Sequence, residues 1–174
     1  MHRLALLIGG NQGNRRALIE QATELIRQRI GSVVALSAIY ETAPWGEFDV
    51  GSEESGVRSF FNRAVVVATE MTAHEALHEA LAIEKELGRV RTVSGQSSPA
   101  SNTGTARIYH SRPMDIDLIF YDDAVIDTPD LHIPHPRAHL RRFVLEPLAE
   151  VIPDYRHPLL GMTVAELLGG LQSG

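Results

Sequence analysis

The chain has 174 residues, 44% of them hydrophobic, with no cysteine and a formal net charge of −6 at pH 7. This is enough apolar material for one domain with a sizeable core, which we expect to span residues 1–174. The negative charge argues against a general nucleic-acid binder, and the absence of cysteine excludes disulfides and thiolate metal sites. The apolar run Leu4–Ile8 is too short for a leader or a membrane span. We expect a cytoplasmic protein that binds neither nucleic acid nor a membrane, and a monomer, since nothing in the sequence demands assembly.

The N-terminal segment predicts a strand, a turn and a helix. Arg3–Ile8 reads as a buried strand that ends at Gly9–Asn14, a turn rich in residues that tolerate positive φ. Apolar residues then recur at helical spacing as far as Ile30, and Gly31 is placed to end the helix. Such a turn can cradle phosphate, but it matches neither the P-loop nor the dinucleotide pattern, so a tight turn without a ligand is at least as good an interpretation.

Two further strands flank a long loop. Ser32–Thr42 and Phe60–Thr69 are rich in β-branched and aromatic residues, and Ala43–Ser59 between them is longer than an ordinary connection in a compact domain. Trp45 in this loop either anchors a core or caps a pocket. Asn62 stands among apolar residues, where its amide must either pair with local backbone or recognise a ligand.

A second helix leads into a basic loop. Thr72–Glu75 is a capping box, and apolar residues continue at helical spacing to Leu87. Glu84, near the helix end, is either a solvated carboxylate or a ligand contact. Gly88–Ser111 has the composition of a loop, and no acidic residue occurs between Leu87 and Met114. We expect this loop to close as a lid over phosphates.

The stretch Arg107–Tyr121 carries the most chemistry. Read as a strand with a period of two, it places Asp115 and Asp117 on one face. The alternate apolar residues fall on the core face: Met114, Ile116, Leu118 and Phe120. Side chains two apart on a strand are separated by about 6 to 7 Å, so the two carboxylates repel unless a cation lies beside them. On its own, such a pair is more often the solvated face of an edge strand, so the metal interpretation depends on context.

The last third of the chain predicts a helical extension. Asp122–Asp127 reads as a turn with a short edge strand, and Leu131–Arg137 is too rich in proline for a helix interior. Helical spacing returns over Ala138–Val151, and a second capping box, Thr163–Glu166, predicts a short helix through Leu168. The order of elements is that of an α+β, ferredoxin-like βαββαβ fold. We expect its antiparallel sheet to carry helices on one face and to leave the other face free for the aspartate pair.

Six motifs occur along the chain in a fixed order: Ile8–Asn11, Tyr40–Pro44, Phe61–Val65, Ile83–Arg91, Arg112–Leu118 and Ile133–Arg137. Together they resemble, nearly end to end, the 6-hydroxymethyl-7,8-dihydropterin pyrophosphokinases of folate biosynthesis. The combination is far more specific than any single motif, and it favours the metal interpretation of the aspartate pair. The resemblance implies transfer of the β,γ-pyrophosphoryl group of ATP to the hydroxymethyl group of the pterin, with release of AMP.

The resemblance also implies which residues form the site. Asp115 and Asp117 would bind two magnesium ions, with ATP as co-substrate. The catalytic residues would be Arg89, Arg91, Arg112, Asp115 and Asp117. The residues on the nucleotide side would be Glu84, Arg89, Arg91, Arg112, Ile116, His135 and Arg141. The residues on the pterin side would be Thr42, Ala43, Pro44, Trp45, Asn62 and Phe143.

Several positions depart from the family pattern. Gly10 stands where Ser is usual, and Pro136 stands where an aromatic residue is common. Ile108 stands at a position that is Arg in some members of the family, and Tyr109 stands where the family has Trp. We therefore expect Arg107 to take part in lid closure instead. The loops 43–59 and 92–111 look longer than is usual in the family.

Two other classes of protein share part of this pattern. His132, His135 and His139 near an acidic pair would suit a zinc hydrolase, but the chain has no His-Glu-x-x-His motif and prolines interrupt the spacing. A ferredoxin-like sheet with a basic loop would also suit an RNA-binding module, but the aromatic pattern of such modules is missing. Metal content after purification and salt-dependent RNA binding would distinguish these classes.

Overall fold

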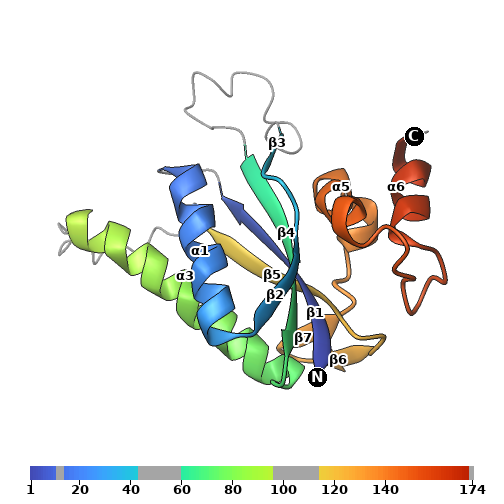
Figure 1. The fold of residues 1–174 in the computed structure, drawn as a ribbon, viewed down its shortest axis with the longest axis horizontal. Helices are drawn as coiled ribbons and strands as arrows, with labels where there is room; N and C mark the ends of the chain where they lie inside the picture. Colours follow the sequence, from blue (N-terminus) through green and yellow to red (C-terminus); the bar gives the residue numbers. More distant parts are fainter. Residues whose placement is uncertain (11–13, 43–59, 96–113, 173–174) are drawn as a thin grey trace.

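The computed structural model describes residues 1–10, 14–42, 60–95 and 114–172 (Figure 1). The strands are β1 His2–Gly10, β2 Ser32–Leu36, β3 Tyr40–Thr42, β4 Phe60–Thr69, β5 Asp115–Tyr121, β6 Ile126–Thr128 and β7 Leu131–Ile133. The helices are α1 Arg15–Arg29, α3 Ala73–Gly95, a 3₁₀ turn Ala138–Leu140, α5 Arg142–Val151 and α6 Val164–Gln172. None of the helices in these ranges has the length and apolarity that a membrane span requires.

The main sheet is antiparallel, in the order β2–β4–β1–β5, and the short β3 pairs with β4. Strands β2 and β3 are one interrupted strand, so the connectivity is βαββαβ with β1 and β4 in the centre. The predicted ferredoxin-like α+β fold is confirmed. Strands β6 and β7 form a separate hairpin that follows β5.

Helices α1 and α3 cover one face of the sheet (Figure 1). The core on this side combines buried residues of β1, α1 and α3: Leu4, Leu6, Ile8, Ile19, Ile26 and Ile83. Helix α3 starts at the predicted capping box, in which the Thr72 N–H donates to the Glu75 carboxylate at 2.9 Å and the Glu75 N–H donates to Thr72 Oγ1 at 3.1 Å. The box at Thr163 and Glu166 forms in the same way at the start of α6. Each cap stabilises its helix by about 1 kcal/mol.

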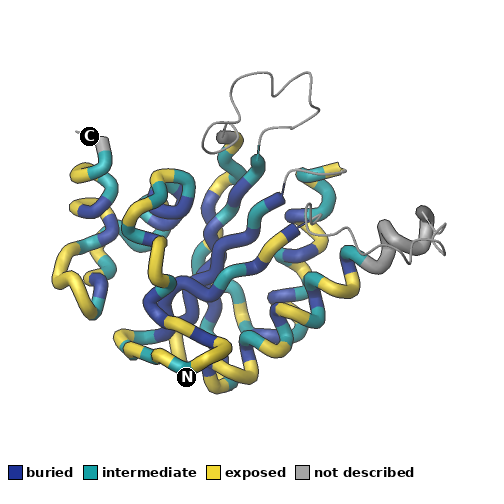
Figure 2. The backbone as a smooth tube through the Cα atoms, turned by 180° about the vertical axis from the view of Figure 1, so that it is seen from behind, coloured by how far each residue is buried: buried dark blue, intermediate teal, exposed yellow. Residues whose placement is uncertain are grey.

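The opposite face of the sheet is covered over most of its length and stays exposed at Asp115, so the prediction of a free face was wrong for the covered part. Helices α5 and α6 pack against it and form a second core: Ala5, Leu7, Ala64, Val66, Val144, Leu145 and Leu148. Figure 2 shows the central strands buried along most of their length. The reason is visible in the sequence, because Leu4–Ile8 and Ala64–Val67 are apolar at consecutive positions, which is typical of strands buried on both faces.

Strand β5 changes face partway along its length. Leu118 lies opposite Leu6 and Phe120 lies opposite Ala5, so Ile119 is an extra residue in the ladder. Phe120 therefore joins the second core, where its ring lies 4.3 Å from that of Tyr155, between ring centroids. The prediction that Phe120 shares a face with Leu118 was wrong, because a β-bulge reverses the alternation of side chains.

The predicted strand Ser32–Thr42 is interrupted at Ser37–Ile39. Ser37 replaces part of the regular ladder with its side chain, because its Oγ accepts a hydrogen bond from the Ala64 N–H at 2.9 Å. The Ser37 N–H in turn donates to the Ala64 carbonyl at 3.0 Å. The chain therefore stays attached to β4 while β3 starts a new, short segment.

Two helix boundaries also differ from the prediction. Helix α3 continues to Gly95, so the predicted loop does not begin at Gly88. A single glycine costs a helix only about 1 kcal/mol, and the arginines that follow it are good helix formers. Helix α5 begins at Arg142 rather than at Ala138, because Arg141 is extended, with φ −120° and ψ 117°.

Candidate functional site

The sheet brings Asn62 and Asp115 onto one face, on either side of Gly9. Gly9 of β1 is paired with Asn62 of β4 and with Asp115 of β5. Tyr40 of β3 extends this row, since it lies opposite Asn62. Residues directly opposite each other in an antiparallel sheet project to the same face, and neighbouring strands are about 4.8 Å apart. A residue predicted for the pterin side thus lies two strands from one predicted for the metal.

The side chain of Asn62 lies over Gly9. A Cβ atom added at Gly9 would lie 2.6 Å from Asn62 Oδ1, closer than real side chains allow. Asn62 itself is only 3% exposed. A buried amide carries hydrogen-bonding groups that must be matched, so this position is suited to recognition of a ligand with fixed donors and acceptors.

Asp115 and Asp117 share a face, as predicted. Asp115 is exposed and Asp117, opposite Leu7, is half-buried. Within the described residues, no group of three or more His, Asp or Glu side chains could hold a metal. Mg²⁺ is commonly bound through only one or two carboxylates, with phosphate oxygens and water completing its octahedron, so this donor set suits a magnesium-bound polyphosphate.

Glu84 holds the strand that carries the aspartates. Its Oε2 accepts a hydrogen bond from the Ile116 N–H at 2.6 Å, across the space between α3 and β5. Ile116 lies between Asp115 and Asp117, on an edge strand whose outward N–H groups have no ladder partner in the described sheet. Glu84 is half-buried and is not the solvated helix end that was one of the two interpretations. Its position fixes the aspartate pair from behind.

His135, Arg141 and Phe143 gather near the start of α5. The His135 N–H donates to the Ile119 carbonyl of β5 at 3.0 Å, which ties this segment to the sheet. Burial, followed by the nearby Arg141, lowers the pKa of His135, so its imidazole is neutral at pH 7. Its Nδ1 accepts from the Arg137 N–H at 3.2 Å, which leaves Nε2 as a donor. The Arg141 guanidinium carbon lies 5.7 Å from the centroid of the Phe143 ring.

The other predicted site residues are described only in part or not at all. Thr42 ends β3, and Arg89 and Arg91 lie in the last turns of α3 rather than in a loop; their side chains lie outside the described residues. The remaining ones lie wholly outside: Ala43, Pro44, Trp45, Arg107 and Arg112. The lid expected over Gly88–Ser111 is helical as far as Gly95, and the rest of it is likewise outside.

Sequence reasoning missed two residues at this end of the sheet. Gly9 was treated only as part of a turn, although its closest neighbour is Asn62. Glu150 of α5 was not singled out, although its carboxylate accepts hydrogen bonds from β3 and the segment before it. The register of β1 against β4 would have revealed the contact of Gly9 with Asn62. No local pattern in the sequence links Glu150 to Ala38, because the two residues lie 112 positions apart.

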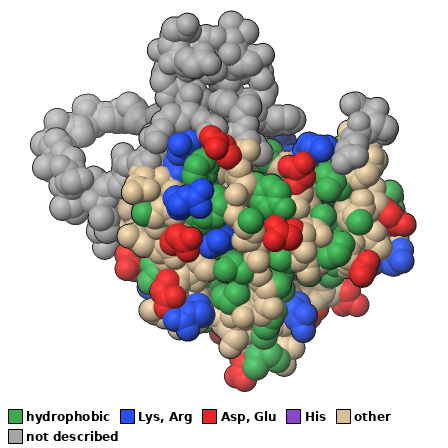
Figure 3. Space-filling view, turned by 45° about the horizontal axis from the view of Figure 1, so that its top comes forward, with side chains coloured by type: hydrophobic (Ala, Val, Ile, Leu, Met, Phe, Trp, Pro, Cys, Tyr) green, Lys and Arg blue, Asp and Glu red, His purple; other side chains and the backbone are tan. Residues whose placement is uncertain are grey.

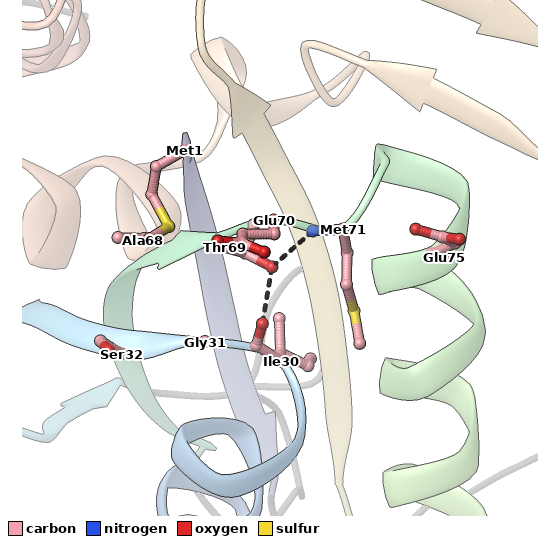
Figure 4. Close-up of a pocket in the computed structure, with 9 residues that line it drawn as sticks. All are labelled: Met1, Ile30, Gly31, Ser32, Ala68, Thr69, Glu70, Met71 and Glu75. Atoms are coloured by element: carbon pink, nitrogen blue, oxygen red, sulfur yellow. Dashed lines mark hydrogen bonds between the residues drawn. The ribbon is translucent and has the colours of Figure 1, made fainter.

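A pocket of about 370 Å³ lies at the far end of the sheet and contains no predicted site residue (Figure 4). Its polar centre is already satisfied, because Thr69 Oγ1 donates to the Ile30 carbonyl at 2.6 Å and accepts from the Met71 N–H at 3.0 Å. Gly31, expected to end a helix, is required here for close packing: an added Cβ would lie 2.2 Å from the Ala68 carbonyl oxygen.

The described surface gives little support to the two rival classes. His132 is paired with Asp127 at 2.8 Å, and the ring of His139 faces His157, with centroids 5.9 Å apart. These histidines are thus engaged elsewhere, rather than gathered with the aspartates as a zinc site requires. On the coloured part of Figure 3, acidic and basic side chains are interspersed, unlike the basic stripe of an RNA-binding surface.

Comparisons with known proteins agree on one family. The sequence profile of 7,8-dihydro-6-hydroxymethylpterin-pyrophosphokinase (HPPK) matches residues 5–153. A 2-amino-4-hydroxy-6-hydroxymethyldihydropteridine pyrophosphokinase of Porphyromonas gingivalis is 36% identical over 154 residues, which cover 88% of this chain and 92% of the relative. The protein of that name from Methylorubrum extorquens is 37% identical over 172 residues, covering 98% and 94%.

A solved structure supports the fold. The Plasmodium falciparum HPPK-DHPS wild type superposes with a TM-score of 0.73 and 17% identity, over 99% of this chain but only 45% of that longer one. The similarity at this identity concerns the fold alone. Taken with the profile match and the identity to relatives of nearly the same length, the chain belongs to the 7,8-dihydro-6-hydroxymethylpterin-pyrophosphokinase family.

Proposed function

We propose that this chain transfers the pyrophosphoryl group of ATP to 6-hydroxymethyl-7,8-dihydropterin, giving the pterin diphosphate and AMP, as a step of folate biosynthesis. The observation that carries the proposal is the row of Asn62, Gly9 and Asp115 across three adjacent strands. This row puts the buried amide of Asn62 beside the pair Asp115 and Asp117 on one face of the sheet. Membership of the family suggests the pterin as the ligand of the amide and magnesium-bound ATP as the ligand of the acidic pair. A monomeric, single-domain, cytoplasmic protein remains our prediction.

On the metal side, Asp115 and Asp117 would bind two magnesium ions. Bound there, the metal would neutralise the triphosphate and keep its β-phosphorus open to in-line attack. The pterin hydroxyl oxygen would form a bond to that phosphorus as the bond to the α-phosphate bridging oxygen breaks, and AMP would leave with the bridging oxygen. The hydroxyl proton would be released to water as the new bond to phosphorus forms. No covalent intermediate with the chain is needed.

On the nucleotide side, charge and neutral donors are combined. His135 at neutral pH offers its Nε2–H as an uncharged donor to a phosphate or ribose oxygen, and Arg141 beside it offers charge. Glu84 and Ile116 would belong to this side through the hydrogen bond that fixes β5. The charge of the transferred group would be neutralised by three arginines: Arg89, Arg91 and Arg112.

On the pterin side, Asn62 would hydrogen-bond the edge of the pterin ring. Its burial supports this role, because a buried amide discriminates strongly between matched and unmatched partners. Phe143 would stack on one face of the ring and Trp45 on the other. Backbone and side-chain contacts along the segment after β3 would complete the subsite: Thr42, Ala43 and Pro44.

The test is product analysis with ATP, magnesium and 6-hydroxymethyl-7,8-dihydropterin. The wild type is compared with Asp115→Ala and Asp117→Ala, and with Asp154→Ala as a control that removes an exposed carboxylate far along the chain from the site. We expect pterin-dependent AMP from the wild type and the control, and a loss of at least a hundredfold in both site variants. ADP or free phosphate as the product would refute pyrophosphoryl transfer and indicate a kinase or a hydrolase.

A further inference from the structure

Strand β3 is short, and it lies next to the proposed pterin subsite. It has three residues, Tyr40–Thr42, and within the described sheet it pairs only with β4. Its first residue, Tyr40, lies opposite Asn62, and its last residue leads into the proposed pterin segment. A three-residue edge strand gains little from its own ladder. Something besides that ladder must fix its position if the subsite is to be preorganised.

The carboxylate of Glu150 supplies this fixation from the neighbouring helix. Its Oε1 accepts from the Tyr40 hydroxyl at 2.8 Å and from the Ala38 N–H at 3.2 Å. Glu150 lies in the last turn of α5, the helix that covers this face of the sheet. Helix α5 contacts β3, and the two lie beside each other in Figure 1. The helical extension thus holds β3 at Tyr40, which lies opposite Asn62, and holds the segment before β3 at Ala38.

The other side of the junction is held independently. Arg63 Nε donates to the Ser37 carbonyl at 3.0 Å, and Ser37 itself is bonded to β4 through both its backbone and its hydroxyl. The chain before Ala38 is therefore anchored without Glu150. The part that depends on Glu150 is Ala38 and the strand β3 that starts two residues later.

We infer that Glu150 and Tyr40 form a positioning pair for the pterin subsite, so that the contact between Glu150 and β3 sets the affinity for the pterin and not that for ATP. The inference rests on the proposed function. Neither residue need touch the substrate. Each acts through β3, by keeping Tyr40 in register with Asn62.

The variants Glu150→Ala, Glu150→Gln and Tyr40→Phe test the pair. Loss of one or two hydrogen bonds that hold β3 should raise the KM for the pterin about threefold to tenfold, while the KM for ATP changes less than twofold. Gln retains an acceptor for both donors, so Glu150→Gln should be rescued to near the wild-type KM. The matched control is Glu146→Gln, which removes a carboxylate of the same helix that pairs with Arg142 at 3.0 Å; its charge acts on Tyr40, but the two hydrogen bonds of Glu150 stay in place.

Amide hydrogen exchange and the two KM values together distinguish failure of this inference from failure of the proposed function. Amide hydrogen exchange without substrates should show faster exchange for residues 38–42 in Glu150→Ala and no change there in Glu146→Gln. If the variants change both KM values equally, or leave the KM for the pterin unchanged, the inference is refuted. In that case the proposed function still stands, provided that the wild type turns over the pterin. No pterin turnover by the wild type would refute the proposed function and this inference with it.

Discussion

Replacing Gly9 by alanine separates folding from recognition in this site. The new Cβ would lie 2.6 Å from Asn62 Oδ1, whereas its other nearest atoms, Asn62 Cγ and the Phe61 carbonyl oxygen, would lie at an ordinary 3.7 Å. Only the tip of one side chain must therefore give way, by roughly 0.5 to 1 Å. That shift is small for the fold, but it is enough to take a short hydrogen bond out of its favourable range.

The expected magnitudes differ for the two properties. An amide that makes two hydrogen bonds to the pterin contributes about 1 to 3 kcal/mol, so its displacement should raise the KM for the pterin roughly fivefold to 150-fold. The free energy of unfolding should change by less than about 1 kcal/mol, because alanine recovers part of the strand propensity that glycine lacks. The KM for ATP should stay within twofold.

The assay is steady-state kinetics with each substrate varied in turn, alongside urea unfolding. Asn62→Ala should reproduce the kinetic defect, and the double variant should add little to either single one. Gly169→Ala is the matched control, since nothing lies within 4 Å of the Cβ it introduces on α6. An unchanged KM for the pterin in Gly9→Ala, or a loss of several kcal/mol of stability, would refute the assignment of Gly9 as the place over which Asn62 reaches the ligand.

Three further predictions concern the elements around the site. Glu84→Ala removes the acceptor of the Ile116 N–H and should lower the free energy of unfolding by about 1 to 2 kcal/mol and reduce magnesium-dependent activity. Glu84→Gln should retain most of both properties. Urea unfolding and magnesium titration check this, and an Ala variant with wild-type magnesium dependence would contradict it. Gly31→Ala brings a Cβ against the rigid backbone oxygen of Ala68 and should lower the free energy of unfolding by about 3 kcal/mol or more, measured by urea denaturation; a neutral effect would show that the close approach is relieved easily. Burial lowers the pKa of His157 in the folded protein, so the unfolded chain binds the proton more readily and the free energy of unfolding should fall as the pH drops below about 6.5. His157→Asn should flatten that dependence between pH 7 and 5. Parallel plots of unfolding free energy against pH for the two proteins would contradict the prediction.

Local signals predicted much of this fold because they act over a few residues. The capping boxes at Thr72 and Thr163 each use atoms three positions apart, and both form as predicted. β4 begins and ends at the predicted residues, since its β-branched run is bounded by turn residues. The shared face of Asp115 and Asp117 follows from the alternation of a strand. These are the parts of the site that sequence reasoning recovered.

What it did not recover depends on contacts between distant segments. The extra residue at Ile119 has no sequence signature, because a bulge replaces one apolar residue with another and changes only the register against β1. The covering of the second face by α5 and α6 was missed because a free face was expected, although consecutive apolar residues in β1 marked it as buried on both sides. Likewise, the position of Asn62 opposite Gly9 is a property of strand pairing, which a single sequence does not reveal.

The bulge in β5 explains how one small sheet carries both a second core and a site on the same face. Before it, Asp115 and Asp117 direct carboxylates to that face; after it, Phe120 directs an aromatic ring to the same face, beneath the C-terminal helices. Without the extra residue, Phe120 would turn toward α1 and α3, whose core is already filled, and the second core would lose its largest buried side chain. Burial of that ring stabilises the fold by about 2 to 3 kcal/mol, so the polar end of the sheet is held in place by the apolar end of the same strand. The register at Ile119 is therefore as much a part of the site as the carboxylates that it positions.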